Sequence, residues 1–140
     1  MFKKQNILIM KKFAFYFLFT FTLTAFAFQV NAVSVPEGVF SALKSGNAKE
    51  LAKFFNTNIE LAILDKEDIY SKTQAEVIVS DFFKQYPVTG YTTVHQGGKE
   101  GSQYVIGTLT TSKGSFRVSI YVKDVSQKAV ISQMRIEKSE

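Results

Sequence analysis

The spacing of apolar residues changes near Val88, and that change constrains the fold more than any other feature. From about residue 34 to residue 86, apart from an extended segment at 59–69, apolar side chains recur every three or four positions, as in amphipathic helices. From Val88 onward they alternate with polar side chains, as in strands that are buried on one face. Helices followed by consecutive hairpins predict an α+β domain, with the helices packed on one face of a bent antiparallel meander sheet.

Two short helices are expected at the start of this pattern. Ser34 and Glu37 have the spacing of a capping box, and Pro36 fits the first turn of the helix that follows. Gly46 should end that helix, and Asn47 should cap the next one at once. The apolar stripe of the second helix is Ala48, Leu51, Ala52, Phe54 and Phe55.

A third, longer helix is the strongest periodic signal in the chain. It follows an extended segment, residues 59–69, which contains a polar turn at 65–68. Ser71 and Gln74 form its capping box, and Tyr86-Pro87 ends it. Its apolar positions are Ala75, Ile78, Val79, Phe82 and Phe83.

Four strands are expected after this helix, and the last two define a register. Their predicted ranges are 89–95, 103–111, 115–124 and 129–137. The register must keep the even-numbered apolar residues of both final strands on one face. Pairs whose residue numbers sum to 252 would place Arg117 opposite Arg135, which is unfavourable. We therefore expect a sum of 254, with Arg117 paired to Glu137 on the outward face.

The first 32 residues have the pattern of a cleaved secretory signal peptide. Four lysines precede an apolar run, residues 13–28, and Val30-Asn31-Ala32 fits a signal-peptidase site. Cleavage is expected after Ala32, with Ala27 as the alternative, and Met10 is a second candidate start. An uncleaved anchor is the other interpretation, but the run is short for the roughly 20 residues that a membrane span requires. The sequence thus predicts export to the periplasm or cell exterior, and a single domain over residues 33–140.

Removing this segment changes the charge of the protein. The whole chain has a net charge of +5, but the part from Val33 onward has 13 basic and 12 acidic residues. No basic cluster with interleaved aromatic residues remains in this part, so a nucleic-acid partner is not expected. The chain contains no Cys, so its stability after export must come from packing without disulfides.

Several short motifs extend over nearly all of residues 33–140. They are Tyr70-Ser71-Lys72-x-Gln74-Ala75-Glu76, Asp81-Phe82-Phe83, His95-x-Gly97, Ile106-Gly107-Thr108-Leu109-x-Thr111, Gly114-x-Phe116-Arg117-Val118 and Arg135-Ile136-Glu137. With this order of elements, the chain resembles the nuclear-transport-factor-2-like, cystatin-related cone fold. More narrowly, it is similar to a family of small exported bacterial proteins, typical of Bacteroidetes, whose function is unknown. The resemblance implies a fold and no activity.

The sequence contains no complete catalytic or metal-binding set. His95 is the single histidine, and a general base or metal site needs partner residues that the sequence does not identify. The segment 97–101 lacks the order of a phosphate-binding loop and is predicted to be a hairpin loop. Asp65, Glu67 and Asp68 lack the spacing of a calcium loop. No cofactor and no metal are therefore expected.

Aromatic residues supply the candidate binding site. Relatives by fold enclose a pocket between the long helix and the concave face of the sheet, and buried tyrosines often line such wet pockets. An ordinary filled core would use the same residues. The candidate site consists of Phe82, Phe83, Tyr86, Tyr91, His95 and Tyr104.

Three classes of function remain. The leading hypothesis is a non-catalytic binding module for a small apolar or amphipathic ligand, or for an envelope protein, with no membrane attachment after signal cleavage. The alternative is a hydrolase or isomerase that uses His95 with a carboxylate, which requires an acidic residue within hydrogen-bond reach of the ring and an open cavity beside it. The third is a structural homodimer formed through the exposed face of the sheet.

Overall fold

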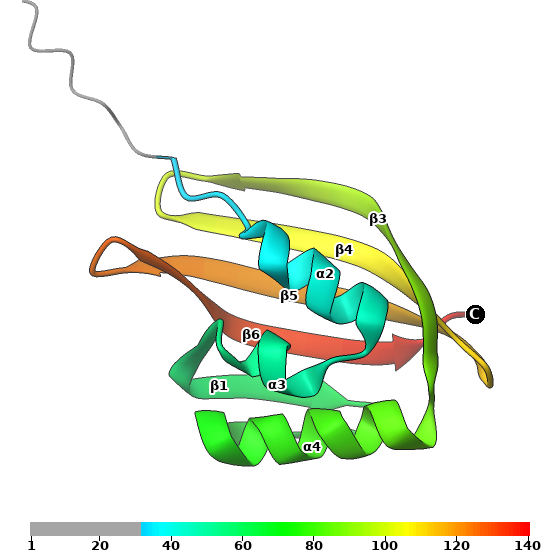
Figure 1. Cartoon of the computed structure of the whole chain (residues 1–140). Coiled ribbons are helices and arrows are strands. Elements are labelled where there is room, and N and C mark those ends of the chain that lie inside the picture. The colour runs from blue at the N-terminus through cyan, green and yellow to red at the C-terminus, as the bar shows by residue number, and fades with distance from the viewer. Residues whose placement is uncertain (1–31) are drawn as a thin grey trace, which may run out of the picture. The chain divides into compact units, whose positions relative to one another are not determined.

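The computed structural model describes residues 32–140, which form one compact unit. The predicted signal peptide, its cleavage sites and the two candidate start residues lie outside this range or at its border. Three helices pack on one face of a curved six-stranded sheet, which confirms the α+β prediction (Figure 1). No helix within residues 32–140 is long and apolar enough to cross a membrane.

Helix α2 spans Glu37–Ser45, and its start differs from the prediction. Pro36 is the N-cap residue, and no side chain caps the helix, so the capping box expected at Ser34 does not form. Pro36 has an extended backbone, which leaves Ser34 outside the helix. The end is as predicted, because Gly46 adopts the left-handed conformation with φ 61°.

Helix α3 is a short turn, Ala48–Ala52, which is capped as expected by the side chain of Asn47. The helical stripe was predicted to continue to Phe55, but Phe55 is already the first residue of strand β1, Phe55–Ile63. There it is buried and lies beside Ile131 of the last strand. Pairing with that distant strand overrides the local helical pattern, which the sequence around Phe55 cannot reveal.

Strand β2, Lys66–Ser71, pairs with β1 as a tight hairpin. The turn between them is Leu64-Asp65, so two of the three carboxylates that were assigned to the turn lie in β2. Helix α4, Lys72–Gln85, follows directly, and its predicted capping box between Ser71 and Gln74 is present. This helix lies beside β1 and β2, whereas α2 lies against β3 (Figure 1).

The remaining strands are β3 (Val88–Lys99), β4 (Ser102–Thr111), β5 (Gly114–Val125) and β6 (Lys128–Lys138). The order across the sheet is β2-β1-β6-β5-β4-β3. All neighbouring strands are antiparallel except β1 and β6, which are parallel. The hairpin loop expected at 97–101 is shorter, because Gly97 to Lys99 continue β3 and pair with β4.

The register predicted for β5 and β6 is confirmed from Phe116 to Tyr121, where paired residue numbers sum to 254. A bulge between Tyr121 and Val122 then shifts the pairing by one, so that Val122 lies opposite Ile131. The bulge lets both of these apolar side chains face the core. Arg117 lies opposite Glu137 as expected, but the two do not form the predicted ion pair.

Candidate functional site

The six residues of the predicted pocket do not form one site. Four of them, Phe82, Phe83, Tyr86 and Tyr91, belong to or pack against the core under the helices. The other two, His95 and Tyr104, lie on the opposite face of the sheet, which we call the outer face. A bulge at Val94, between Thr93 and His95, places the His95 ring on this outer face.

Aromatic side chains fill the space between α4 and the concave face of the sheet. The ring of Phe116, from the middle of the sheet, meets Phe82 edge-on at a centroid distance of 5.1 Å. It meets Tyr86 in the same way at 4.8 Å, and Phe82 and Tyr86 lie 5.0 Å apart. Edge-on contacts at these distances are typical of a packed core. These three rings form a filled aromatic cluster in the space that the candidate pocket would occupy.

Tyr91 is buried on the other side of this core, where its ring stacks on Phe40 at 6.2 Å. It lies over Gly107, where the absence of a side chain leaves room for the ring. Burial raises the pKa of the Tyr91 phenol, and the hydroxyl of Thr93 partly opposes that increase. The Tyr91 hydroxyl nevertheless makes no hydrogen bond of normal geometry. It is thus a polar group whose burial carries a cost.

The hydrogen-bond partner of His95 is a tyrosine, whereas the enzyme hypothesis requires a carboxylate. The His95 Nε2 lies 2.9 Å from the hydroxyl of Tyr104, and both side chains are accessible to solvent. The ring borders an open groove of about 730 Å³ on the outer face, which Glu137 also lines. No carboxylate of residues 32–140 is hydrogen-bonded to the ring. The cavity that this hypothesis needs is therefore present, but the acid–imidazole pair is not.

Residues 32–140 contain no group of three or more His, Cys, Asp or Glu side chains that could hold a metal ion. The carboxylates of Glu67 and Asp68 point to opposite faces because strand β2 alternates its side chains, and Asp65 lies in the turn before that strand. Glu67 instead binds Arg135 across the sheet.

A groove between α4 and the β1–β2 hairpin has a mostly apolar lining. Its volume is about 510 Å³, within the range of small-molecule sites. Four positions on one side of α4 face it, namely Ile78, Asp81, Phe82 and Gln85. The hairpin supplies the opposite wall, which consists of Leu61, Ile63, Leu64, Asp65, Lys66 and Tyr70. The groove thus has an apolar floor and a charged rim.

Leu64 at the mouth of this groove has an unusual backbone. Its φ angle is 54°, in the left-handed region that leucine rarely occupies. Its amide donates a 2.9 Å hydrogen bond to the carbonyl of Ile136, which holds the turn in place. Its side chain is 36% exposed, although it is fully apolar. A strained residue that presents an apolar side chain to a groove is typical of a binding site.

Most residues of this groove were not predicted from the sequence. The period of α4 identified Ile78 and Phe82 among its apolar positions, but Asp81 and Gln85 lie beside that stripe, at its border with solvent. Their spacing of four was visible without revealing what they face. The opposite wall depends on the position of the β1–β2 hairpin, which is set by the parallel pairing of β1 with β6.

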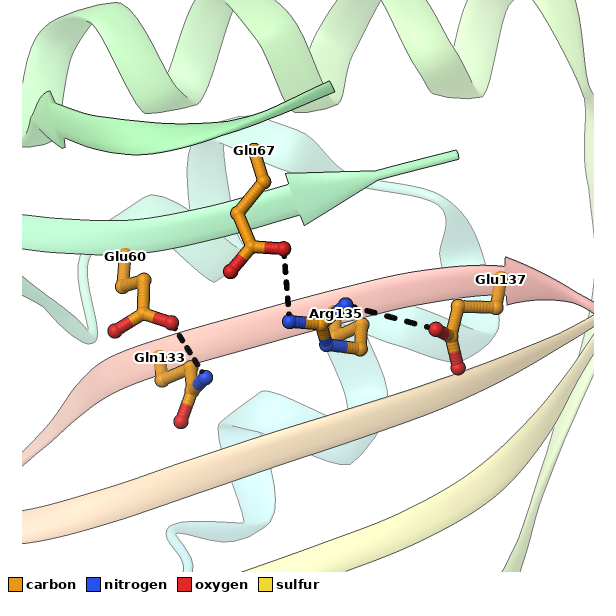
Figure 2. A network of polar contacts seen from close by, with 5 residues as sticks. All are labelled: Glu60, Glu67, Gln133, Arg135 and Glu137. Carbon is orange, nitrogen blue, oxygen red and sulfur yellow. Dashed lines mark hydrogen bonds and ion pairs between the residues drawn. The ribbon is translucent and has the colours of Figure 1, made fainter. Parts of the chain in front are cut away.

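The outer face carries a polar network over β1, β2 and β6 (Figure 2). Arg135 is its centre, with a guanidinium nitrogen 2.9 Å from the Glu67 carboxylate and another 3.6 Å from Glu137. The hydrogen bond to Glu67 raises the pKa of the Arg135 guanidinium above its usual value. Beside this network, the amide of Gln133 donates a 2.7 Å hydrogen bond to Glu60.

Comparisons with known proteins agree with this architecture. The family model described as "Domain of unknown function (DUF4783)" matches residues 36–137. The chain belongs to the DUF4783 family. The crystal structure of a family member from Bacteroides uniformis is 39% identical, with a TM-score of 0.73, and the match covers 76% of this chain and 99% of that one. A member from Bacteroides ovatus is 35% identical, with the same TM-score, and the match covers 76% and 96%.

More distant structures share the fold alone. A protein of unknown function with a cystatin-like fold from Nostoc punctiforme is 12% identical, with a TM-score of 0.58 over 73% of this chain and 84% of that one. The similarity to nuclear-transport-factor-2-like and cystatin-like folds confirms the fold that the sequence suggested. No curated protein matches the chain. DUF4783 family membership therefore establishes a fold and brings no activity with it.

Proposed function

We propose that this DUF4783 protein, once exported, is a non-catalytic binding module that holds a small amphipathic ligand in the groove between α4 and the β1–β2 hairpin. The observation that carries the proposal is the groove itself, with its volume of about 510 Å³ and its apolar floor. The core behind it is filled by Phe82, Tyr86 and Phe116, so a ligand would bind at this surface groove.

The rim of the groove favours one kind of polar head group. Asp65 and Asp81 contribute two carboxylates, and Lys66 contributes one ammonium group. This excess of negative charge is complementary to a cationic head, such as an amine, attached to an apolar body. Ile78 and Leu64 offer the apolar surface that the body would cover. Burial of that surface should give a negative heat-capacity change on binding.

The test is a calorimetric titration of residues 33–140 with a long-chain alkylamine and with the fatty acid of the same chain length. The amine should bind more tightly, because the carboxylates of the rim attract it and repel the acid. Ile78→Trp should weaken binding by filling the groove. Val77→Trp is the matched control, because Val77 immediately precedes Ile78 in α4 but is 56% exposed and does not line the groove. Absence of amine binding, or equal binding by both variants, would contradict the proposal.

A further inference from the structure

The outer face is divided into two halves of opposite charge. The half formed by β3, β4 and β5 carries three cations at its outward positions, Lys99, Arg117 and Lys123, and no carboxylate at those positions. The half formed by β2, β1 and β6 carries the carboxylates of Glu60, Glu67 and Glu137 and two cations, Arg135 and, at the end of β6, Lys128. One half therefore has an excess of positive charge and the other an excess of negative charge.

The same face carries apolar and aromatic side chains that no element of residues 32–140 covers. Ile69 is 69% exposed and Val94 is 68% exposed, the highest values among the large apolar side chains of the described residues. Tyr121 is 45% exposed, and its ring lies 6.2 Å from Tyr104, which in turn contacts His95. Tyrosine and arginine are the residue types that contribute most at protein interfaces.

From these two observations we infer that the outer face binds a second copy of this chain, with the positive half of each copy on the negative half of the other. The required two-fold axis lies between the two sheets and runs parallel to the strands, at the centre of the sheet between β5 and β6. This axis would place β5 over β6, β4 over β1 and β3 over β2 of the second copy. A face with this charge division is complementary to itself under that operation. An axis across the strands would instead place each half on itself, which like charges oppose.

The pairing across the sheet then predicts which side chains meet. Arg117 and Glu137 lie in one cross-strand row, so each Arg117 would face Glu137 of the other copy. His95 and Glu67 end a second row, His95-Ile106-Ser119-Arg135-Ala62-Glu67, and they would meet in the same way. Within residues 32–140, Arg117 has no ion-pair partner, so its guanidinium is available for such a contact.

The area of the face is sufficient for such a dimer. Six strands about 4.8 Å apart, with about nine residues each at roughly 3.3 Å per residue, give a surface of about 700 Å². A stable protein interface buries roughly 600–1,000 Å² on each partner, a range that includes this value. Because most of the complementarity comes from exposed charges, the dimer should weaken with salt.

The experiment uses residues 33–140 and measures mass by sedimentation over a range of concentrations. The wild-type chain should be a dimer at low salt, and it should dissociate towards about 1 M salt, where charges are screened beyond about 3 Å. Arg117→Glu and Glu137→Lys should each weaken dimerisation roughly tenfold or more, because each places two like-charged pairs in the interface. Lys113→Glu, in the β4–β5 turn away from this face, is the charge-matched control and should dimerise like the wild type.

Mixing the two charge-reversal variants, Arg117→Glu and Glu137→Lys, distinguishes contacts between copies from contacts within one chain. In a mixed dimer, the carboxylate introduced at position 117 of one chain faces the ammonium group introduced at position 137 of the other, and the unchanged Glu137 faces the unchanged Arg117. An equimolar mixture should therefore form heterodimers with about wild-type affinity, although each variant alone does not. A wild-type chain that stays monomeric at low salt, or a mixture that forms no heterodimer, overturns the inference. A dimer that the single reversals leave intact also overturns it, because that dimer uses another face.

Discussion

Arg117 of β5 lies directly opposite Glu137 of β6, yet the Glu137 carboxylate lies 3.6 Å from the guanidinium of Arg135 and forms no ion pair with Arg117. Residues 135 and 137 are two apart on one strand, so their side chains share a face. Arg135 is already fixed by its hydrogen bond to Glu67, which brings its second nitrogen within reach of Glu137. Cross-strand position alone therefore does not decide which charges pair.

The first prediction concerns this network. Arg135→Met should lower the free energy of unfolding, because Glu67 and Glu137 would lose the cation between them. The side chain is 35% exposed, so the loss should be below about 1 kcal/mol. Arg117→Met should change stability less, because it removes no ion pair within the described residues. Urea unfolding at low and high salt measures both variants, and a larger loss for Arg117→Met would contradict this assignment.

The second prediction concerns Tyr91, whose buried hydroxyl lacks a hydrogen-bond partner. Tyr91→Phe should raise the free energy of unfolding by about 1 kcal/mol, because it removes an unsatisfied polar group and keeps the ring stacked on Phe40. Denaturant unfolding at neutral pH measures the gain. A loss of stability would mean that the hydroxyl is hydrogen-bonded in solution, through water or through Thr93.

The raised pKa of Tyr91 adds a pH dependence to this comparison. The phenol stays protonated in the folded state above the pKa of about 10 at which it ionises in the unfolded chain. Its contribution to stability is fully present below that pH and is lost as the pH rises through the folded pKa. The wild type should therefore lose stability above about pH 10 more steeply than Tyr91→Phe. Parallel curves for the two proteins would contradict the shift.

The sequence was sufficient for features that depend on local spacing. Helix α4 and its cap were predictable because Ser71, Gln74 and the apolar stripe lie within one segment. The β5–β6 register was predictable because parity and the charges of Arg117 and Arg135 left one choice. The start of β1 was not predictable, because Phe55 is held by a parallel partner 76 positions further along the chain, Ile131.

The candidate site shows the same limit. His95 and Tyr104 were grouped with Tyr91 as candidates for one pocket, but the bulge at Val94 turns the His95 side chain to the other face, and Tyr104 alternates with the core residue Val105. A bulge adds one residue to one strand. In a segment of mostly polar residues, the sequence has no alternation of apolar and polar positions that would reveal this extra residue. The groove was missed for a different reason, since its two walls meet only after the hairpin packs against α4.

The third prediction concerns the turn between β5 and β6, Ser126-Gln127, where both residues have positive φ angles of 52° and 64°. Two-residue hairpin turns of this kind favour Asn-Gly. The double change Ser126→Asn and Gln127→Gly should therefore raise the free energy of unfolding by about 1 kcal/mol. Lys113→Gly is the control in the β4–β5 turn, where φ is not positive, and it should lower stability. Thermal unfolding compares them, and equal effects would show that backbone strain is not the cause.

The last prediction concerns Leu64, whose strained backbone and exposed side chain both occur at the mouth of the groove. Leu64→Gly relieves the strain of the left-handed conformation, which is of order 1 kcal/mol, but it also removes a partly buried side chain. These two effects on the free energy of unfolding oppose each other, so stability should change little, whereas affinity for the alkylamine should fall because one apolar wall is lost. Denaturant unfolding and calorimetric titration measure the two effects separately. If stability falls and affinity is unchanged, Leu64 is a packing residue of the β1–β2 turn, and its strain has no connection with binding.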